Sequence, residues 1–486
     1  MQLVKVRIEN FGPINKASIE TKPLTLIIGK NNQGKSYSVV LIFTLLQLRQ
    51  FLTSAIGVSV GPRKNSLGIS VQPRYRGRLP GRGGHVREHR LITIKREDFD
   101  KDKDYSLAAQ IVDNTVSTLL FFVENNLQSL LEERFGMNVG ALVNICAPVA
   151  NLNFDLSKYL SIAISISRKG KVGVKFYRKE KELDKLKLKV VPFIKKMRSD
   201  LDMVLEMEGP FPRHTFDLFH FLFNELNGRA KEGIGDLVYI PAGRAGLLEG
   251  YYGVASALFA LSSVAITRGI SMPPMPPSAA IYYNTMLRFT GTAGVFKGIS
   301  SELGSEVLDG QVALKHGERQ RVMPRIIYTF SKGKSRGRVD VIHAGSMVKE
   351  LAGLYLTIRE KIKPGTYLMV EEPESHLHPS AQKKLARILM KLAASGVNLL
   401  ITTHSDIILR KIAHLVGQLQ KTDSKDILPA SRVSVILLKE GGRGSISEKL
   451  AIPPSGVLEG IPTFDEVITE LYEEEINLES QPSKEE

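Results

Sequence analysis

Two adjacent carboxylates, Glu371 and Glu372, follow the apolar run YLMV and precede Pro373. Neighbouring carboxylates repel each other, so a protein that keeps both ionised needs positive charge close to them. Three explanations compete for such a pair: a solvated turn, a metal site, or a catalytic pair tuned by its placement. The choice between them depends on what the rest of the chain brings to the same place.

A phosphate-loop pattern, G-x-x-x-x-G-K-[ST], occurs without a mismatch near the N-terminus. In this pattern glycines let backbone N–H groups turn toward phosphates, the lysine reaches the β and γ oxygens, and the serine ligates Mg²⁺. The loop lies between an apolar strand and an uncharged helix, which makes a glycine turn that binds nothing the weaker explanation. The predicted ATP-binding residues are Gly29, Lys30, Asn31, Asn32, Gln33, Gly34, Lys35, Ser36 and Tyr37.

A phosphate loop gives the two carboxylates separate roles. The apolar strand carries Glu371 to its carboxyl end, which is where a parallel sheet presents ligands. We therefore assign Glu371, with Ser36, to the magnesium ion or its waters, and Glu372 to the attacking water.

A histidine, His404, ends a second apolar strand, NLLITTHS. A lone histidine is usually a core or surface residue. Here, however, the strand follows the Glu371–Glu372 strand after one helix, expected from Pro379 to about Ala394, and a βαβ unit makes such strands parallel near neighbours. We therefore expect His404 and Glu372 at the same sheet edge, with His404 contacting the γ-phosphate.

Three further residues, Glu374, His376 and His378, have the side chains of a second metal site. Because Pro379 is suited to the first position of a helix, His378 is expected to cap that helix instead. The sequence favours a turn between sheet and helix over a second metal.

Strands and helices alternate along the chain in the pattern of an α/β protein. We expect a turn at Gly12-Pro13, a buried helix after Ser36 and a hairpin turning at Gly170. Expected strands are residues 2–9, 17–28, 235–246 and 398–405, with several more in 311–341, and expected helices are 104–135, the lysine-rich stretch after residue 179, and 379–394.

The chain of 486 residues is basic, with a formal charge of +16 and 43% apolar residues. Residues 465–486 hold nine acids and one lysine, and subtracting this net −8 from +16 leaves +24 on residues 1–464. The stretch 74–90, rich in arginine and glycine and containing Tyr75, predicts contact with DNA or RNA. The alternative is a solubilising loop, and we expect residues 61–90 to be a loop or mobile hairpin.

The single cysteine, Cys146, excludes an intrachain disulfide and favours a cytoplasmic location. The N-terminus has no apolar signal core. Residues 250–267 are uncharged but contain several Gly, Ser and Tyr residues, so a buried helix is expected there rather than a membrane span.

The segments VKVRIENFGPINKASIETKPLTLIIGKNNQGKS, EEPESHLHP and LLITTHSD resemble the ABC-type ATPases of the RecF, SMC and OLD-nuclease group of AAA family ATPases. The resemblance covers roughly residues 1–50 and 235–475. It implies a P-loop NTPase head, two of which close around two ATP molecules in a homodimer or higher homo-oligomer. Glu371 then matches the magnesium-associated acid, Glu372 the catalytic acid and His404 the switch histidine.

The resemblance also implies a signature motif at a helix N-terminus that reaches the partner's nucleotide. HAGSMVKEL places Ser346 there, but Met347 stands where the family usually has glycine. The family's glutamine loop has no clear counterpart, and the strand end Tyr239–Arg244 is the candidate for it.

Two departures from the family concern its accessory domains. About 185 residues of mixed helix and hairpin replace a long coiled coil, and the residues after His404 lack the acidic motifs of a TOPRIM nuclease domain. The expected organisation is residues 1–60 and 235–464 as the two parts of the head, a basic insertion at 61–234 and an acidic tail at 465–486.

The sequence thus predicts an Mg²⁺-dependent ATPase, Lys35, Glu372 and His404 being its catalytic residues, that acts as a switch on nucleic acid or on a partner effector such as a nuclease. Repair and defence are the expected settings. A P-loop phosphotransferase and a non-hydrolysing ATP-binding protein remain alternatives, whereas a GTPase would need an Asn-Lys-x-Asp motif that the chain lacks.

Overall fold

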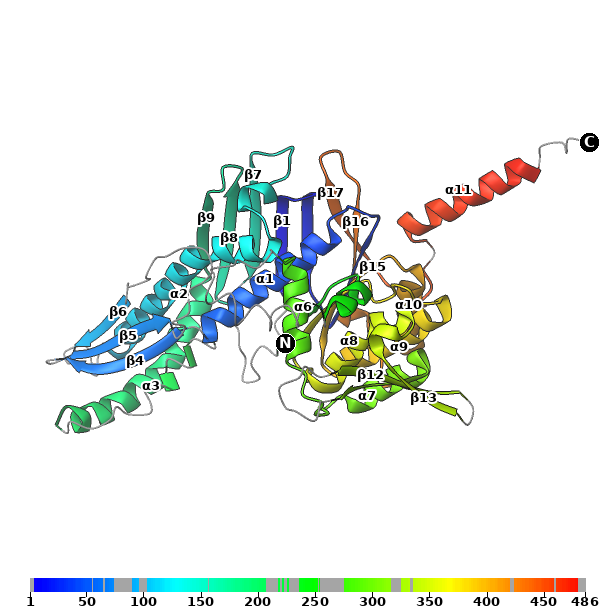
Figure 1. The fold of residues 1–486 in the computed structure, drawn as a ribbon. Helices are drawn as coiled ribbons and strands as arrows, with labels where there is room; N and C mark the ends of the chain where they lie inside the picture. The colour runs from blue at the N-terminus through cyan, green and yellow to red at the C-terminus, as the bar shows by residue number, and fades with distance from the viewer. Residues whose placement is uncertain are drawn as a thin grey trace, which may run out of the picture. The chain divides into compact units, whose positions relative to one another are not determined.

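The computed structural model of the chain describes most of its length in two compact units (Figure 1). Unit 1 comprises residues 1–19 and 40–234, and unit 2 comprises residues 20–39 and 235–486. The described residues are 4–54, 56–63, 66–73, 90–95, 103–155, 157–206, 236–251, 275–315, 325–332, 335–419, 424–458 and 460–479, with short pieces between 217 and 253. Residues 1–19 and 40–60, which were predicted to belong to the head, fall in unit 1 together with the insertion.

Unit 2 contains a mainly parallel sheet. Its strands, in sheet order, are β10 (Leu237–Ile240), β14 (Tyr367–Glu371), β15 (Asn398–Thr403), β3 (Leu24–Gly29), β16 (Val433–Lys439) and β17 (Ser445–Leu450). The first five are parallel to their neighbours, and only β17 runs antiparallel, to β16. This arrangement confirms the α/β fold, and it places the carboxyl ends of β3, β14 and β15 at one edge.

The central strands of unit 2 are apolar because helices and loops cover both faces. Every residue of β3 and β15 is buried. The helices are α6 (Pro277–Leu287), α7 (Lys297–Leu303), α8 (Ser346–Glu360), α9 (Pro379–Ala394), α10 (Asp406–Leu419) and α11 (Pro462–Glu479). Apolar side chains of α8, α9 and α10 join those of the strands in one core, so the strand ends that carry the polar residues are rigidly held.

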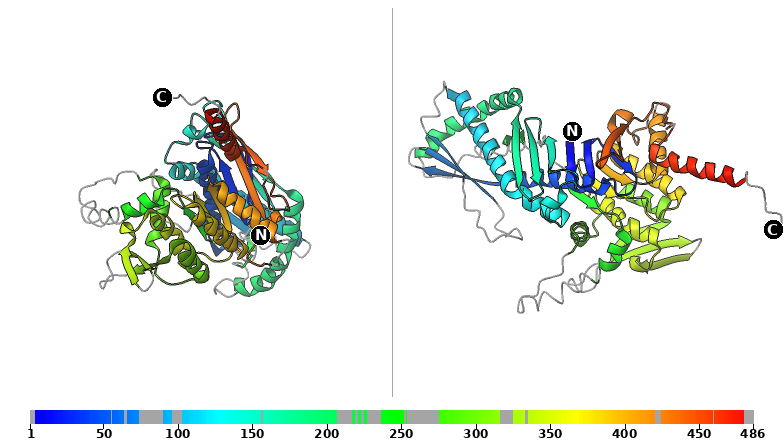
Figure 2. Two further views of the ribbon diagram at one scale, coloured as in Figure 1. Left: turned by 90° about the vertical axis from the view of Figure 1, so that its right-hand side faces the viewer. Right: turned by 90° about the horizontal axis from the view of Figure 1, so that it is seen from above.

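A separate three-stranded antiparallel sheet lies in unit 2 between α7 and α8 in the sequence. It consists of β11 (Gly310–Lys315), β12 (Arg325–Lys332) and β13 (Ser335–Asp340). These strands agree with those predicted for residues 311–341. Residues 469–477 of α11 are all exposed. Figure 2 shows the ribbon in two further views, with α11 in red.

Unit 1 contains an antiparallel sheet and three long helices. The sheet order is β2 (Ile14–Glu20), β1 (Lys5–Phe11), β7 (Val149–Asp155), β8 (Leu160–Ser167) and β9 (Val172–Arg178). The helices are α1 (Lys35–Ser54), whose first turn belongs to unit 2, α2 (Asp104–Phe135) and α3 (Glu180–Glu206). The predicted helix over 104–135, the hairpin at Gly170 and the lysine-rich helix are all confirmed.

One expectation about local structure is wrong, and another is confirmed in part. The strand predicted over 17–28 is two strands, β2 and β3, because the chain turns at Lys22–Thr25, where the Lys22 amide donates to Thr25 Oγ1 at 2.8 Å. For residues 61–90 a loop or a hairpin was expected, and the hairpin agrees in part with the structure. Antiparallel strands β4 (Ile56–Arg63) and β5 (Ser66–Pro73) pair as a hairpin, and β6 (Arg90–Lys95) joins them in a three-stranded sheet.

The long helix α2 is apolar enough to cross a membrane by length and composition. Its residues Ala108, Ile111, Val112 and Leu119 are fully buried in unit 1, as in a core helix. The segment 250–267, for which a buried helix was predicted, and the basic stretch 74–90 lie almost wholly outside the described residues.

Candidate functional site

The phosphate loop joins β3 to α1, and its backbone has the conformation that its glycines allow. Gly34 has a φ of +89° and Gly29 a φ of +150°, and a Cβ at Gly29 would lie 2.3 Å from the Leu438 carbonyl oxygen. Side chains are therefore excluded at Gly29 by the neighbouring strand β16. Gln33 is held from the opposite side by a hydrogen bond from Ser445 of β17.

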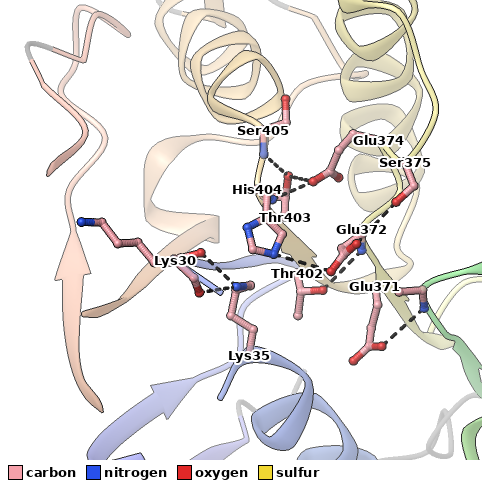
Figure 3. Close-up of polar contacts among 12 residues, drawn as sticks. Lys30, Lys35, Glu371, Glu372, Glu374, Ser375, Thr402, Thr403, His404 and Ser405 are labelled. Atoms are coloured by element: carbon pink, nitrogen blue, oxygen red, sulfur yellow. Dashed lines mark hydrogen bonds and ion pairs between the residues drawn. The ribbon is translucent and has the colours of Figure 1, made fainter. Parts of the chain in front are cut away.

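Lys35 begins α1, and its side chain folds back over the loop (Figure 3). Its Nζ donates to the carbonyl oxygens of Gly29 at 2.9 Å and Lys30 at 2.7 Å. Burial lowers the pKa of Lys35 to about 8, although the nearby carboxylates, chiefly Glu372, oppose this shift. An anionic ligand in the loop would replace these carbonyl contacts and favour the charged amine.

Glu371 ends β14 and is 5% exposed. Its Oε2 lies 3.4 Å from the Ala242 amide, while Oε1 is a buried oxygen without a well-formed hydrogen bond among the described residues. Burial raises the pKa of Glu371, and the hydroxyls of Ser36 and Tyr239 partly offset this effect. A buried carboxylate beside the Ser36 hydroxyl is a donor set that suits Mg²⁺.

Glu372 is held in an unusual backbone conformation, with a φ of +44°. Positive φ in a residue with a side chain costs on the order of 1–3 kcal/mol and persists only when surrounding contacts hold it. Here the Glu372 amide donates to the Thr402 carbonyl at 2.9 Å, and its own carbonyl accepts from Arg244 at 3.0 Å. The strained turn redirects the side chain away from the path of the strand.

The Glu372 side chain meets His404, which follows β15. His404 Nε2 lies 3.5 Å from Glu372 Oε1 (Figure 3). The hydrogen bond with His404 lowers the pKa of Glu372, and burial opposes it. The pairing of β14 with β15 is parallel, as predicted, and it brings an ionised carboxylate and an imidazole together within reach of the phosphate loop. Figure 3 shows Lys35, Glu372 and His404 converging at this edge.

Arg244 is the site residue whose role the sequence did not reveal, although it ends the segment proposed as a glutamine loop. It is fully buried and forms a 3.1 Å ion pair with Glu350 of α8. Its guanidinium also donates to the main-chain oxygens of Glu371 at 2.5 Å and Glu372 at 3.0 Å. Arg244 thus fixes the backbone of both acids and ties it to the helix that begins at Ser346. The strand-ending sequence YIPAGR was its only signal.

We expect Arg244→Met to lower the free energy of unfolding of unit 2 by about 3–5 kcal/mol, because it leaves the Glu350 carboxylate buried without its partner. Urea unfolding followed by circular dichroism measures this loss. The matched control is Arg387→Met, which removes a partly exposed pair with Glu306 and should cost less than about 1 kcal/mol. If both variants unfold at the same urea concentration, the buried Arg244–Glu350 pair does not stabilise unit 2 more than the surface pair does.

Ser346 occupies the first position of α8, after Gly345 as N-cap, and is exposed. The structure describes no hydrogen bond between Ser346 and the phosphate loop of the same chain. Met347 is partly buried against the core of unit 2. The Ser346 side chain is therefore available at a helix N-terminus, where the signature motif was predicted.

The second metal site considered for Glu374, His376 and His378 is not favoured by the geometry. His378 Nδ1 accepts from the Ser380 amide at 3.3 Å, which confirms its role as the N-cap of α9. In the part of the chain that the structure describes, no group of three His, Cys, Asp or Glu residues could hold a metal ion.

The sequence matches two family profiles on either side of the insertion. Residues 1–121 match the family described as "AAA ATPase domain", and residues 295–410 match "AAA domain, putative AbiEii toxin, Type IV TA system". The first match contains the phosphate loop, and the second contains Ser346, Glu371, Glu372 and His404. No curated protein matches the chain.

Several solved structures are similar to the chain at low sequence identity. One is an Smc head bound to the C-winged helix domain of ScpA, with a TM-score of 0.41, 10% identity and coverage of 93% of this chain and 98% of that chain. Another, from Pyrococcus furiosus, is an Smc head with an extended coiled coil bound to the C-terminal domain of ScpA. Its TM-score is 0.39 and its identity 11%, and the match covers 97% of this chain and 99% of that chain. The SMC head domain from Thermotoga maritima has a TM-score of 0.36 and 11% identity, and the match covers 93% of this chain and 99% of that chain.

The likeness to AAA-type ATPase domains rests on the two sequence matches and on the motifs that they contain. These motifs come together at one edge of a parallel sheet in unit 2. Residues 1–121 and 295–410 are therefore similar to AAA-type ATPase domains.

Proposed function

We propose that the chain hydrolyses ATP with Mg²⁺, that ATP binding joins two heads, and that hydrolysis releases them. The observation that carries the proposal is the position of Glu372. Its strained backbone is held by Thr402 and Arg244 so that its carboxylate faces His404 beside the phosphate loop. A turn that served only to connect β14 to α9 would not need this strain.

Each residue of the site has a distinct task in this proposal. Lys35 and the loop amides bind the phosphates, and Ser36 and Glu371 would hold Mg²⁺, which offsets phosphate charge when bound. The lowered pKa of Glu372 keeps it ionised, so that it orients a water molecule and accepts its proton. His404 donates its Nε2 proton to Glu372 or to a γ-phosphate oxygen and so links the state of the nucleotide to the acid.

Dimerisation through ATP is supported by the exposure of Ser346. Serine at an exposed helix N-terminus presents a hydroxyl and free amides to an anion. Because these groups make no described contact with the loop of their own chain, we infer that they serve the nucleotide of a second copy. Larger homo-oligomers could use the same contact.

Nucleic acid and a separate effector protein are the proposed partners, and the cytoplasm is the proposed location. The basic charge of unit 1 includes the exposed side chains of Lys169, Lys171 and Lys175 on the β8–β9 hairpin. Cationic side chains that neutralise phosphates give affinity without sequence selectivity. A head that responds to ATP could use this affinity in repair or defence.

We expect Lys169→Glu, Lys171→Glu and Lys175→Glu together to weaken nucleic-acid binding at least about tenfold and to reduce the salt slope by roughly 3, one for each phosphate contact. Fluorescence anisotropy with labelled duplex DNA and with RNA, over a salt series, measures both values. A control with Lys383→Glu and Lys384→Glu on α9 of unit 2 should leave them nearly unchanged. A salt slope that is unaffected by the hairpin substitutions would remove the hairpin from the proposal.

The proposal as a whole is tested by phosphate release from ATP with Mg²⁺ or with EDTA, with and without DNA or RNA. Steady release in Mg²⁺ alone or with nucleic acid supports an ATPase. Consumption of ATP only when a small acceptor is present would indicate a phosphotransferase, and tight binding without release would indicate a non-hydrolysing protein.

A further inference from the structure

A third carboxylate, Glu374, lies beside the catalytic pair and has no role in the chemistry described above. Its Oε1 accepts two hydrogen bonds, from the main-chain amide of His404 at 2.6 Å and from Thr403 Oγ1 at 2.8 Å (Figure 3). Its Oε2 is buried and has no hydrogen bond among the described residues. One oxygen of Glu374 therefore holds two consecutive residues at the end of β15.

The contacts of Glu374 continue on both sides. The Thr403 hydroxyl, while donating to Glu374, accepts from the Ser405 amide at 2.9 Å, which fixes its orientation. On the other strand, the Ser375 amide donates to the Glu372 carbonyl at 3.1 Å, so that Glu372 and Glu374 lie in one hydrogen-bonded turn. Glu374 thus connects the turn after β14 to the residues that follow β15.

This connection spans the two groups whose relative position matters for hydrolysis. The 3.5 Å separation of His404 Nε2 and Glu372 Oε1 depends on where the His404 backbone lies. That backbone belongs to a segment leaving the sheet, and without Glu374 its amide would have no acceptor in the described structure. A displacement of about 1 Å at such a site can reduce a rate on the order of a hundredfold.

We propose that Glu374 is a positioning residue, whose acceptor oxygen holds the His404 backbone so that the imidazole faces Glu372 during hydrolysis. The inference rests on the proposed function of that site. The described hydrogen bonds of the Glu374 side chain go to Thr403 and His404 and none goes to the phosphate loop, so it acts through His404. Both contacts are accepted by Oε1, so a neutral side chain with the same acceptor oxygen should serve as well as the carboxylate.

The test compares three substitutions in the full chain. Glu374→Ala removes the acceptor and should lower kcat about 10- to 100-fold, with the KM for ATP changed less than about threefold. Glu374→Gln keeps an acceptor oxygen in place and should stay within about threefold of wild type. Glu306→Ala, a carboxylate paired with Arg387 at the surface, is the matched control and should change neither constant.

A double-mutant cycle separates positioning from general stability. If Glu374 acts through His404, Glu374→Ala should have little further effect on kcat in a His404→Ala background. Circular dichroism and melting temperature verify folding, and Glu374→Asp, which is one methylene shorter, replaces the alanine variant if that variant does not fold. The aspartate variant should likewise lose kcat at nearly constant KM.

Three results would overturn the inference: an unchanged kcat in both the alanine and aspartate variants, an equal loss in the glutamine and alanine variants, or additive effects with His404→Ala. Failure of the proposed function is distinguishable, because Glu372→Gln would then turn over ATP normally. If Glu372→Gln loses ATP turnover while Glu374→Ala keeps the kcat of the wild type, only the role of Glu374 is contradicted.

Discussion

Glu372→Gln is expected to reduce ATP turnover at least about a hundredfold while preserving ATP binding, as for loss of a positioned base. Glutamine has nearly the same shape and still accepts the His404 hydrogen bond, but it cannot take a proton from water. The backbone contacts that hold residue 372, from Thr402 and Arg244, do not involve its side chain. The variant should therefore keep the geometry of the site and lose its chemistry.

The oligomeric state of Glu372→Gln in the presence of ATP is a second measurable property of this variant. Because hydrolysis is blocked, Glu372→Gln should accumulate the ATP-bound state, and light scattering should show a dimer with ATP and Mg²⁺. The matched control is Glu306→Gln, a surface carboxylate of unit 2 that should behave as wild type. A monomer of Glu372→Gln under every condition would contradict the proposal that ATP joins two heads.

Lys35→Met should weaken ATP binding on the order of a hundredfold or more. Truncating one partner of a buried charge pair costs about 2–5 kcal/mol, which includes leaving the other charge without its partner. Lys35 Nζ donates to the carbonyls of Gly29 and Lys30, so the loop holds the amine where a phosphate would meet it. Methionine fills much of the same volume without charge.

Equilibrium dialysis with labelled ATP measures the affinity of the Lys35→Met variant. The control is Lys383→Met, the same substitution at an exposed position of α9. It should bind ATP as wild type does. Equal affinities of the two variants would show that the phosphate loop is not where ATP binds.

The phosphate loop and the three strand ends were predictable because their signals are local. A glycine-rich turn with a fixed spacing, an apolar strand before it and an uncharged helix after it define the loop without knowledge of the tertiary structure. The βαβ rule then joined β14 to β15 and so brought Glu372 toward His404. The sequence also predicted the helix α9, and its predicted start at Pro379 and end near Ala394 agree with the structure.

The supporting residues were not predictable in the same way. Arg244 donates to main-chain oxygens of Glu371 and Glu372, more than a hundred positions away in the sequence. Every residue type has a main-chain carbonyl, so the sequence does not show which residues accept these hydrogen bonds. The positive φ of Glu372 is equally hidden, because glutamate has no preference for that conformation. Glu374 was assigned to a turn, and only the structure places its oxygen on the amide of His404.

The most direct test of the central claim is single-turnover release of phosphate from ATP by purified wild-type and Glu372→Gln proteins in Mg²⁺. We predict release by the wild type and, in the same time, retention of intact ATP by the variant. Release at the same rate from both proteins would contradict the assignment of Glu372 as the residue that activates water.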